Sequence, residues 1–153
     1  MALELTSSAF KNNGYIPQKY TGEGPDVSPA LAWSNPPQGT KSFALICDDP
    51  DAPVGDWVHW VIYNIPAGVN ALAENVPQDK VLKDGLTQGK NDFRRIGYNG
   101  PMPPPGKPHR YFFKLYALDA EFKLAPGLLK KELLKLMESH VLEEAQLLGM
   151  YRR

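Results

Sequence analysis

The stretch VGDWVHWVIYNIPA, residues 54–67, has the composition of a buried β-strand. It is rich in aromatic and β-branched residues, and it ends at a proline, which central strands exclude. One residue departs from this pattern: His59 places an imidazole inside an apolar run. Three carboxylates, those of Asp48, Asp49 and Asp51, stand just before the stretch. The first question is therefore whether His59 packs in a core or binds a ligand.

The composition of the 153-residue chain narrows the classes of function. Its 17 basic residues balance 17 acidic residues, which leaves no electrostatic footprint for nucleic acid or an anionic membrane. The single cysteine, Cys47, cannot form an internal disulfide and favours a reducing compartment. The N-terminal residues MALELTSSAF lack the basic and apolar regions of a signal peptide, and no apolar run has the length of a membrane span. We therefore expect a single domain, 1–153, in the cytoplasm, without nucleic-acid or membrane partners.

Strand patterns separated by glycine and proline occupy much of the chain. Three of them form the predicted core: Ser42–Asp48, which is apolar enough for a strand buried on both faces, Trp57–Ile65 and His109–Asp119. Two shorter candidates precede them, ALELTS and SPALAWSNPP. The segments that join these strands do not read as the helical crossovers of an α/β fold, so the pattern predicts a mainly antiparallel sheet.

The C-terminal part of the sequence changes to a helical pattern. Between Leu128 and Met137, apolar residues recur at positions 129, 133, 136 and 137. A second short helix is predicted from Glu143 to Leu148, after a break at Ser139 and His140. Two C-terminal helices beside a mostly antiparallel sheet predict a mainly β, α+β architecture.

Residues 97–108, GYNGPMPPPGKP, predict a stiff loop over one end of the sheet. Eight of these twelve residues are glycine or proline. Proline fixes the backbone and removes a hydrogen-bond donor, whereas glycine lets a ligand approach the backbone closely. The segment is too short for a linker between domains, and strand-like sequences flank it. A long irregular segment in a compact domain is often functional.

Two histidines stand near the starts of predicted strands. Strand alternation places His59 on the same face as Tyr63 and Ile65, and it places His109 on the same face as Tyr111. If the two strands are neighbours, the two histidines and the tyrosine converge at one rim of the sheet. The carboxylates of Asp49 and Asp51 could reach the same rim.

Such a cluster suits a small anion. A neutral imidazole offers one N–H, an imidazolium offers two, and a tyrosine hydroxyl adds another. Backbone N–H groups of a glycine-rich loop can add more, and a nearby carboxylate favours the charged histidine. A single histidine in a strand is more often a core residue, so the inference depends on the loop and the carboxylates occurring together.

Two other chemistries are weaker alternatives. Two histidines and a carboxylate can form a metal-binding triad, but the sequence contains no HxH or HExxH spacing. A serine nucleophile would be expected in a GxSxG turn, which is absent. We therefore expect no metal site, no cofactor and no catalytic nucleophile, although hydrolysis by the His/Asp rim stays open.

The motifs DDPDAP, WVHW and GPMPPPGKPHRYFF, in this order, resemble the signature blocks of the phosphatidylethanolamine-binding proteins, also called Raf-kinase-inhibitor-like proteins. GPDVSPALAWSNPP and the tail HVLEEAQLLGMYRR resemble further elements of that family, so the resemblance covers nearly the whole chain. Three residues, 54–56, separate DPDAP from Trp57. The short spacing resembles the compact bacterial and archaeal branch, the YbhB/YbcL type, because eukaryotic members carry an insertion there.

The resemblance implies a large antiparallel sheet packed with a smaller one, and an anion pocket. It implies pocket roles for Asp49, His59, His109 and Tyr111. Gly100 would offer its backbone N–H to the anion, and the walls would be Pro53, Trp57 and Pro101. A cis peptide bond is implied between Ala52 and Pro53. The sequence departs from the family at Met102 and Asn99, which could alter loop contacts and ligand choice.

Three functions follow as expectations. The first is a non-enzymatic module that binds phosphate or a phospholipid head group. The second is a protease or kinase inhibitor that acts through protein contacts, and the third is a His/Asp hydrolase. Compact relatives often form homodimers, and a net charge of zero would permit self-association. Arg110 points away from the histidine face by alternation, so a buried structural ion pair with Asp51 is predicted.

Overall fold

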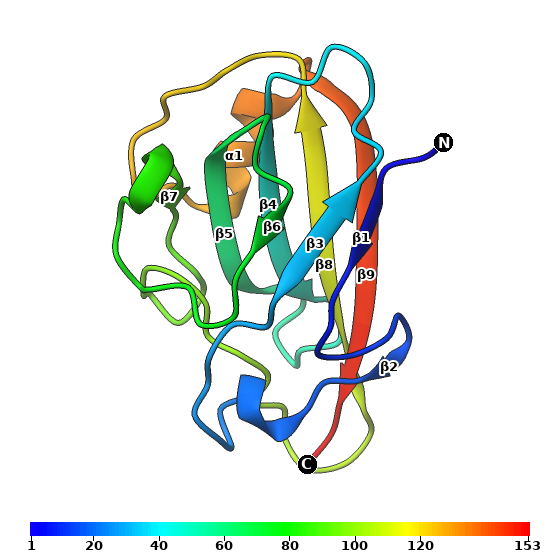
Figure 1. Ribbon diagram of the computed structural model, residues 1–153. Helices are drawn as coiled ribbons and strands as arrows, with labels where there is room; N and C mark the ends of the chain where they lie inside the picture. The colour runs from blue at the N-terminus through cyan, green and yellow to red at the C-terminus, as the bar shows by residue number, and fades with distance from the viewer.

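A computed structural model describes residues 1–153 and contains two β-sheets and one α-helix (Figure 1). The strands are β1 (Glu4–Thr6), β2 (Gly14–Tyr15), β3 (Leu31–Ser34), β4 (Ser42–Asp49), β5 (Trp57–Pro66), β6 (Ala71–Leu72), β7 (Thr87–Gln88), β8 (His109–Leu118) and β9 (Val141–Tyr151). The helix is α1 (Lys130–Met137), and two 3₁₀ turns are η1 (Gln18–Tyr20) and η2 (Lys83–Gly85).

The larger sheet has six strands in the order β2-β9-β8-β4-β5-β7. All its neighbours are antiparallel except the short pair of β2 and β9. Strand β4 lies in the interior, and all eight of its residues are buried, as its nearly continuous apolar sequence predicts. The smaller sheet has the order β1-β3-β6.

The sheets are held together by a hydrophobic cluster that contains inward-facing residues from both. Leu5, Leu31 and Trp33 come from the smaller sheet, and Phe43 and Leu45 come from the larger one. A second cluster on the other face of the larger sheet includes Leu133 and Met137 of α1. Figure 1 shows the smaller sheet in front of the larger one and α1 behind it. The predicted mainly β fold, with a large antiparallel sheet packed with a smaller sheet, is confirmed.

The second predicted helix, Glu143–Leu148, is wrong. These residues belong to β9, which pairs with β8 along its length from Val141 to Tyr151. Alternate residues of β9 face the core, namely Ala145, Leu147, Gly149 and Tyr151. This alternation of buried and exposed residues extends past residue 148, where the predicted helix ended. It outweighs the local helix propensity of the segment, because pairing with a neighbouring strand and burial decide whether a short segment forms a helix or a strand.

A β-bulge in β5 isolates His59. Across the pairing with β4, Cys47 lies opposite Trp60 and Asp48 lies opposite Val58, so no β4 residue lies opposite His59. Bulges bend a strand and redirect side chains, and they are frequent next to binding sites. The irregularity falls at the end of β4, where the Asp-rich segment begins.

The bulge makes the expected face of His59 wrong. Tyr63 packs in the cluster that contains α1, whereas His59 packs against Tyr111, whose ring belongs to the cluster between the sheets. A second register shift near the start of β4 moves Ile65 to the cluster between the sheets as well. The strict alternation assumed from the sequence fails at both irregularities.

Two further observations concern the chain as a whole. The structure contains no cis peptide bond, so the predicted cis bond between Ala52 and Pro53 is wrong. The turn here is closed by a hydrogen bond in which the Gly55 N–H donates to the Ala52 carbonyl over 2.9 Å, with Gly55 at a positive φ of 100°. None of the helices has the length and hydropathy needed to cross a bilayer.

Candidate functional site

The site lies where β4 ends and β5 and β8 begin, at the lower end of the large sheet in Figure 1. Because β4 is antiparallel to both neighbours, its last residue meets the first residues of each. Asp49 is that last residue, and it stands between His59 on β5 and His109 on β8. The predicted convergence occurs, although the two histidine strands flank β4 and are not neighbours of each other.

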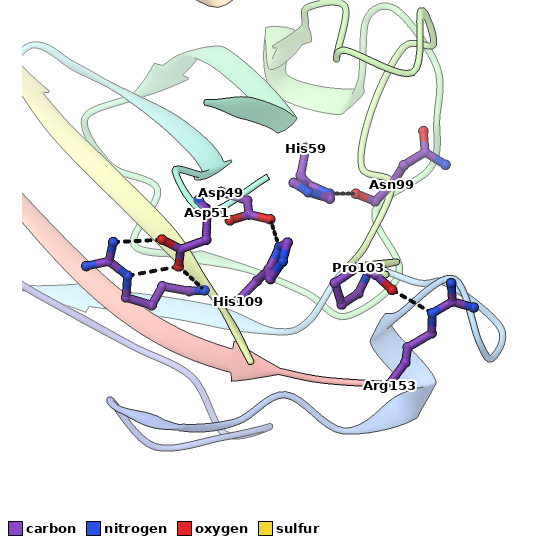
Figure 2. Close-up of polar contacts among 8 residues, drawn as sticks. Asp49, Asp51, His59, Asn99, Pro103, His109 and Arg153 are labelled. Carbon is purple, nitrogen blue, oxygen red and sulfur yellow. Dashed lines mark hydrogen bonds and ion pairs between the residues drawn. The ribbon is translucent and has the colours of Figure 1, made fainter. Parts of the chain in front are cut away.

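Asp49 and His109 form an ion pair at the floor of the site. The Nδ1 atom of His109 lies 2.7 Å from Oδ2 of Asp49, and both side chains are largely buried. The other oxygen, Oδ1, accepts the backbone N–H of Asp51 over 2.7 Å. Because a carboxylate has no hydrogen to give, His109 donates through Nδ1, and its Nε2 has no protein partner. Figure 2 shows this pair beside the neighbouring Asp51.

His59 is joined to the loop before β8 by two hydrogen bonds. Its Nδ1 donates to the carbonyl of Asn99 over 2.6 Å (Figure 2). The Asn99 N–H donates to the His59 carbonyl over 3.1 Å. The residue is 3% exposed, and burial lowers the pKa of His59 below its usual value. His59 is therefore neutral at pH 7, with its proton on Nδ1.

Aromatic rings complete the surroundings of the two histidines. Tyr111 packs edge-on against His59 and stacks beside His109, with centroid distances of 5.2 and 6.5 Å. Burial, followed by the charge of Asp49, raises the pKa of Tyr111, so its hydroxyl keeps its proton. Phe93 lies 5.4 Å from the ring of His59 and 5.5 Å from that of Trp57.

These groups surround a cavity of about 250 Å³. This volume is below the range of roughly 300–1,000 Å³ that is typical of pockets for drug-sized ligands, so it suits a small ligand. Six of the nine predicted site residues line the cavity: Asp49, Pro53, Trp57, His59, His109 and Tyr111. The remaining lining residues are Ala52, Val54, Phe93, Met102, Pro103 and Pro104.

Sequence reasoning did not select this second group. Met102 was noted only as a departure from the family pattern, and the two prolines follow from the predicted position of the loop over the sheet. Phe93 lies in an irregular segment just before the loop 97–108, and no sequence signal identifies it. Because Phe93, Met102 and the prolines are apolar, they shield the polar floor from water.

Gly100 and Pro101 do not line the cavity. The Gly100 N–H donates to Oδ1 of Asp26 over 2.7 Å, so it is not free for an anion, and the role predicted for it is wrong. The carbonyl of Pro101 accepts the N–H of Gly22 over 2.8 Å. Glycine is needed here because a Cβ at Gly100 would fall on the carbonyl oxygen of Tyr20. These two residues anchor the loop, and the wall is made by the residues after them.

Asp51 also lies outside the cavity. It accepts hydrogen bonds from Nε and Nη2 of Arg110, each over 2.9 Å, and from the Arg110 N–H (Figure 2). The guanidinium lowers the pKa of Asp51. The predicted ion pair exists, but the Arg110 side chain is 48% exposed, so the pair is not buried. Breaking an exposed pair destabilises a fold far less than breaking a buried pair, which leaves an uncompensated buried charge.

The loop that forms the cavity wall is fixed from two directions. Asn91 donates to the carbonyl of Gly97 and to the side chain of Asn99, over 2.9 and 2.8 Å. At its far end, Nε of Arg153 donates to the carbonyl of Pro103 over 2.6 Å (Figure 2). The stiff loop predicted from glycine and proline content is thus held by side chains as well.

No group of three or more His, Cys, Asp or Glu residues is arranged to hold a metal ion.

Comparisons with known proteins agree with this architecture. A family model described as phosphatidylethanolamine-binding protein matches residues 6–152. A UPF0098 protein of the archaeon Methanothermobacter thermautotrophicus is 53% identical over 151 residues, covering 99% of each chain. A UPF0098 protein of Aquifex aeolicus is 46% identical over 153 residues, covering 99% of this chain and 89% of the relative.

Two solved structures share the fold. The crystal structure of a phosphatidylethanolamine-binding protein homologue from Chlamydia trachomatis superposes with a TM-score of 0.90 at 39% identity, covering 99% of this chain and 98% of the homologue. The crystal structure of E. coli YbcL, described as a member of the mammalian PEBP family, gives a TM-score of 0.93 at 34% identity, covering 100% and 99% of the two chains.

Proposed function

The chain belongs to the phosphatidylethanolamine-binding protein family, and we propose that it is a non-enzymatic protein that binds a small oxyanion, such as phosphate or a phosphorylated head group, in the cavity at the end of the large sheet. The observation that carries this proposal is the buried pair of Asp49 and His109 at the cavity floor. The proposal keeps the cytoplasmic location expected from the single thiol, Cys47, which is buried.

His109 is the group that attracts the anion. With Nδ1 donating to Asp49, a second proton on Nε2 gives the ring a positive charge and a donor toward the cavity. The carboxylate of Asp49 stabilises this charged ring, and the ring then makes a charge-assisted hydrogen bond to an anionic oxygen. The hydroxyl of Tyr111, which keeps its proton, is a second donor at the same floor.

The residues around the cavity support binding without turnover. They include no serine, threonine, cysteine or lysine. Tyr111 carries the only hydroxyl, and its raised pKa makes the phenol a poor nucleophile. A hydrolase would have to use a water molecule activated by His59, His109 or Asp49. Absence of p-nitrophenol release from p-nitrophenyl phosphate, at concentrations where phosphate binds, separates binding from hydrolysis.

Calorimetric titration with inorganic phosphate tests the proposal. The cavity is open to solvent on one side, so we expect a Kd between about 1 μM and 1 mM. His109→Gln should weaken binding by about tenfold or more, because it removes the charged donor. His140→Gln is the matched control, since His140 forms the same kind of pair with Asp119 over 2.8 Å but lies outside the cavity.

The inhibitor alternative is tested with the same variants. If the protein inhibited a kinase or protease through surface contacts alone, inhibition would persist in His109→Gln. Loss of phosphate binding together with unchanged inhibition would favour that alternative over a binding module.

A further inference from the structure

The hydrogen bond of His59 to the loop restricts what the cavity can bind. The Asn99 carbonyl can only accept, so Nδ1 of His59 must carry the hydrogen of the 2.6 Å contact. The reciprocal bond from the Asn99 N–H to the His59 carbonyl holds both residues in this arrangement. The bulge at His59 turns its side chain to the face on which Tyr111 lies.

The other nitrogen, Nε2, faces the cavity as a hydrogen-bond acceptor. The His59 ring makes no hydrogen bond besides that of Nδ1, and His59 lines the cavity. No fully buried side-chain nitrogen or oxygen lacks a partner in this structure, so Nε2 reaches the cavity surface. Burial keeps the ring neutral, and a neutral ring protonated on Nδ1 presents a lone pair at Nε2.

The neighbours of His59 do not supply a hydrogen to this lone pair. Both oxygens of Asp49 are acceptors, and they already receive the Asp51 N–H and the His109 Nδ1–H. Phe93 and Tyr111 pack edge-on against the ring, with centroid distances of 5.4 and 5.2 Å, and the Tyr111 hydroxyl makes no hydrogen bond to His59. A ligand oxygen placed against His59 must therefore bring its own hydrogen, because a bare anionic oxygen would meet a lone pair and a carboxylate.

We propose that the cavity selects an oxyanion that keeps a proton, namely inorganic phosphate or a phosphomonoester, over sulfate and over the phosphodiester of an intact phospholipid. This inference rests on the proposed function, and it names the ligand class of the same site. The anionic oxygens are bound by His109 and Tyr111, and the protonated oxygen donates to Nε2 of His59.

The chemistry of the ligands makes the distinction sharp near pH 6. A phosphomonoester loses its second proton with a pKa of about 6, so a large fraction still carries a P–OH group. Sulfate and phosphodiesters carry no such hydrogen at this pH. A site with a buried acceptor discriminates strongly against a ligand that leaves the acceptor unpaired.

The test is calorimetric titration of the wild type at pH 6 with four ligands. Phosphate and sulfate form a pair matched in size. Phosphoethanolamine and glycerophosphoethanolamine form a pair that distinguishes a free monoester from a phospholipid head group, and both carry the ammonium group. We expect the protonated member of each pair to bind at least about tenfold more tightly.

His59→Leu removes the acceptor. In this variant the affinity ratio of phosphate to sulfate, and that of phosphoethanolamine to glycerophosphoethanolamine, should each fall to about threefold or less. His140→Leu is the control and should keep them. If His59→Leu does not fold, nitrogen chemical shifts of the wild-type imidazole replace it. A free acceptor Nε2 whose signal shifts on addition of phosphate, and not of sulfate, supports the inference.

Two outcomes overturn the inference in distinguishable ways. If all four ligands bind with similar affinity, or if His59 proves doubly protonated at pH 6, the selectivity is wrong and the proposed function stands. If none of the four binds, the proposed function fails and the inference fails with it.

Discussion

His59 shows what a single residue in a strand can and cannot reveal. Its presence in an apolar run indicates a candidate site only together with the three carboxylates and the loop rich in glycine and proline. The direction of its side chain was not predictable, because the bulge that turns it depends on the register between β4 and β5. Its protonation follows from one backbone carbonyl, that of Asn99, forty positions away. Such long-range partners leave no signal in the local sequence.

The buried neutral ring makes a prediction about stability. The folded protein holds the pKa of His59 below the value in the unfolded chain, so the unfolded state binds the proton more readily. Protonation of His59 therefore does not lower the free energy of unfolding above about pH 6.5. Below that pH the free energy of unfolding falls as the pH decreases. The slope contributed by one such group is at most about 1.4 kcal/mol per pH unit.

Thermal unfolding between pH 8 and pH 5 checks this prediction. The melting temperature of the wild type should fall more steeply below pH 6.5 than that of His59→Gln, which has no group to titrate. His140→Gln, altered at a more exposed histidine, should follow the wild type. Parallel curves for the wild type and His59→Gln would show that His59 does not resist protonation in the folded state.

At the scale of elements, the position of the loop before β8 depends on close packing around Gly100 as much as on its prolines. The position of Gly100 is set by contacts with Tyr20 and Asp26, which belong to a segment more than seventy residues earlier. The Asp26 contact explains why the upstream motif GPDVSP accompanies the loop in this sequence. The motif tethers the loop through Gly100, and the loop then presents Met102 and the prolines to the cavity.

Gly100→Ala should therefore destabilise the protein by about 1–3 kcal/mol or more, because the added methyl group meets backbone that cannot yield. Gly68→Ala is the matched control, since a Cβ at Gly68 meets no atom within 4 Å. Urea unfolding of both variants measures the difference. Equal stability of the two variants would mean that the loop moves readily away from Tyr20.

The sequence predicted correctly those elements whose pattern lies within a short stretch of the chain, and it failed for elements that depend on distant partners. The buried run of β4 and the helix near Leu133 were identified correctly, because hydrophobic pattern alone specifies them. β9 was mistaken for a helix in its middle, since its partner β8 lies some thirty positions earlier in the chain. Six of nine site residues line the cavity because the motifs sit at strand ends. Gly100 and Pro101 were misplaced because their hydrogen-bond partners cannot be read from spacing. Asp51 lies outside the cavity because its carboxylate is bound to Arg110, the partner that the sequence predicted for it.

At the scale of the whole molecule, self-association is a prediction that the surface supports. Large apolar side chains are exposed between residues 129 and 142, and the net charge is zero, so repulsion between copies is weak. The exposed apolar residues of this segment are Leu129, Leu134, Leu136, Val141 and Leu142. We expect light scattering to show a homodimer of the 17.0 kDa chain at micromolar concentration.

Leu142→Lys should weaken this dimer by about tenfold or more, because a charge would enter an apolar contact. Val81→Lys is the control, since Val81 is exposed to a similar degree but lies far along the chain from this segment. A species of 17.0 kDa over the whole concentration range would dismiss the dimer.

The last strand of the large sheet connects the fold as a whole to the cavity. After β9, the side chain of Arg153 donates to the carbonyl of Pro103, and the Arg153 carbonyl accepts the Gly106 N–H over 3.4 Å. These bonds hold the wall made by Met102, Pro103 and Pro104 above the histidines. Arg153→Ala should therefore loosen the wall and weaken phosphate binding about two- to fivefold, within the effect of one lost hydrogen bond of about 0.5–1.5 kcal/mol. Arg152→Ala removes an adjacent arginine that makes no such bond, and it should bind phosphate like the wild type. Identical affinities for the two variants would show that the wall keeps its position without the Arg153 contact.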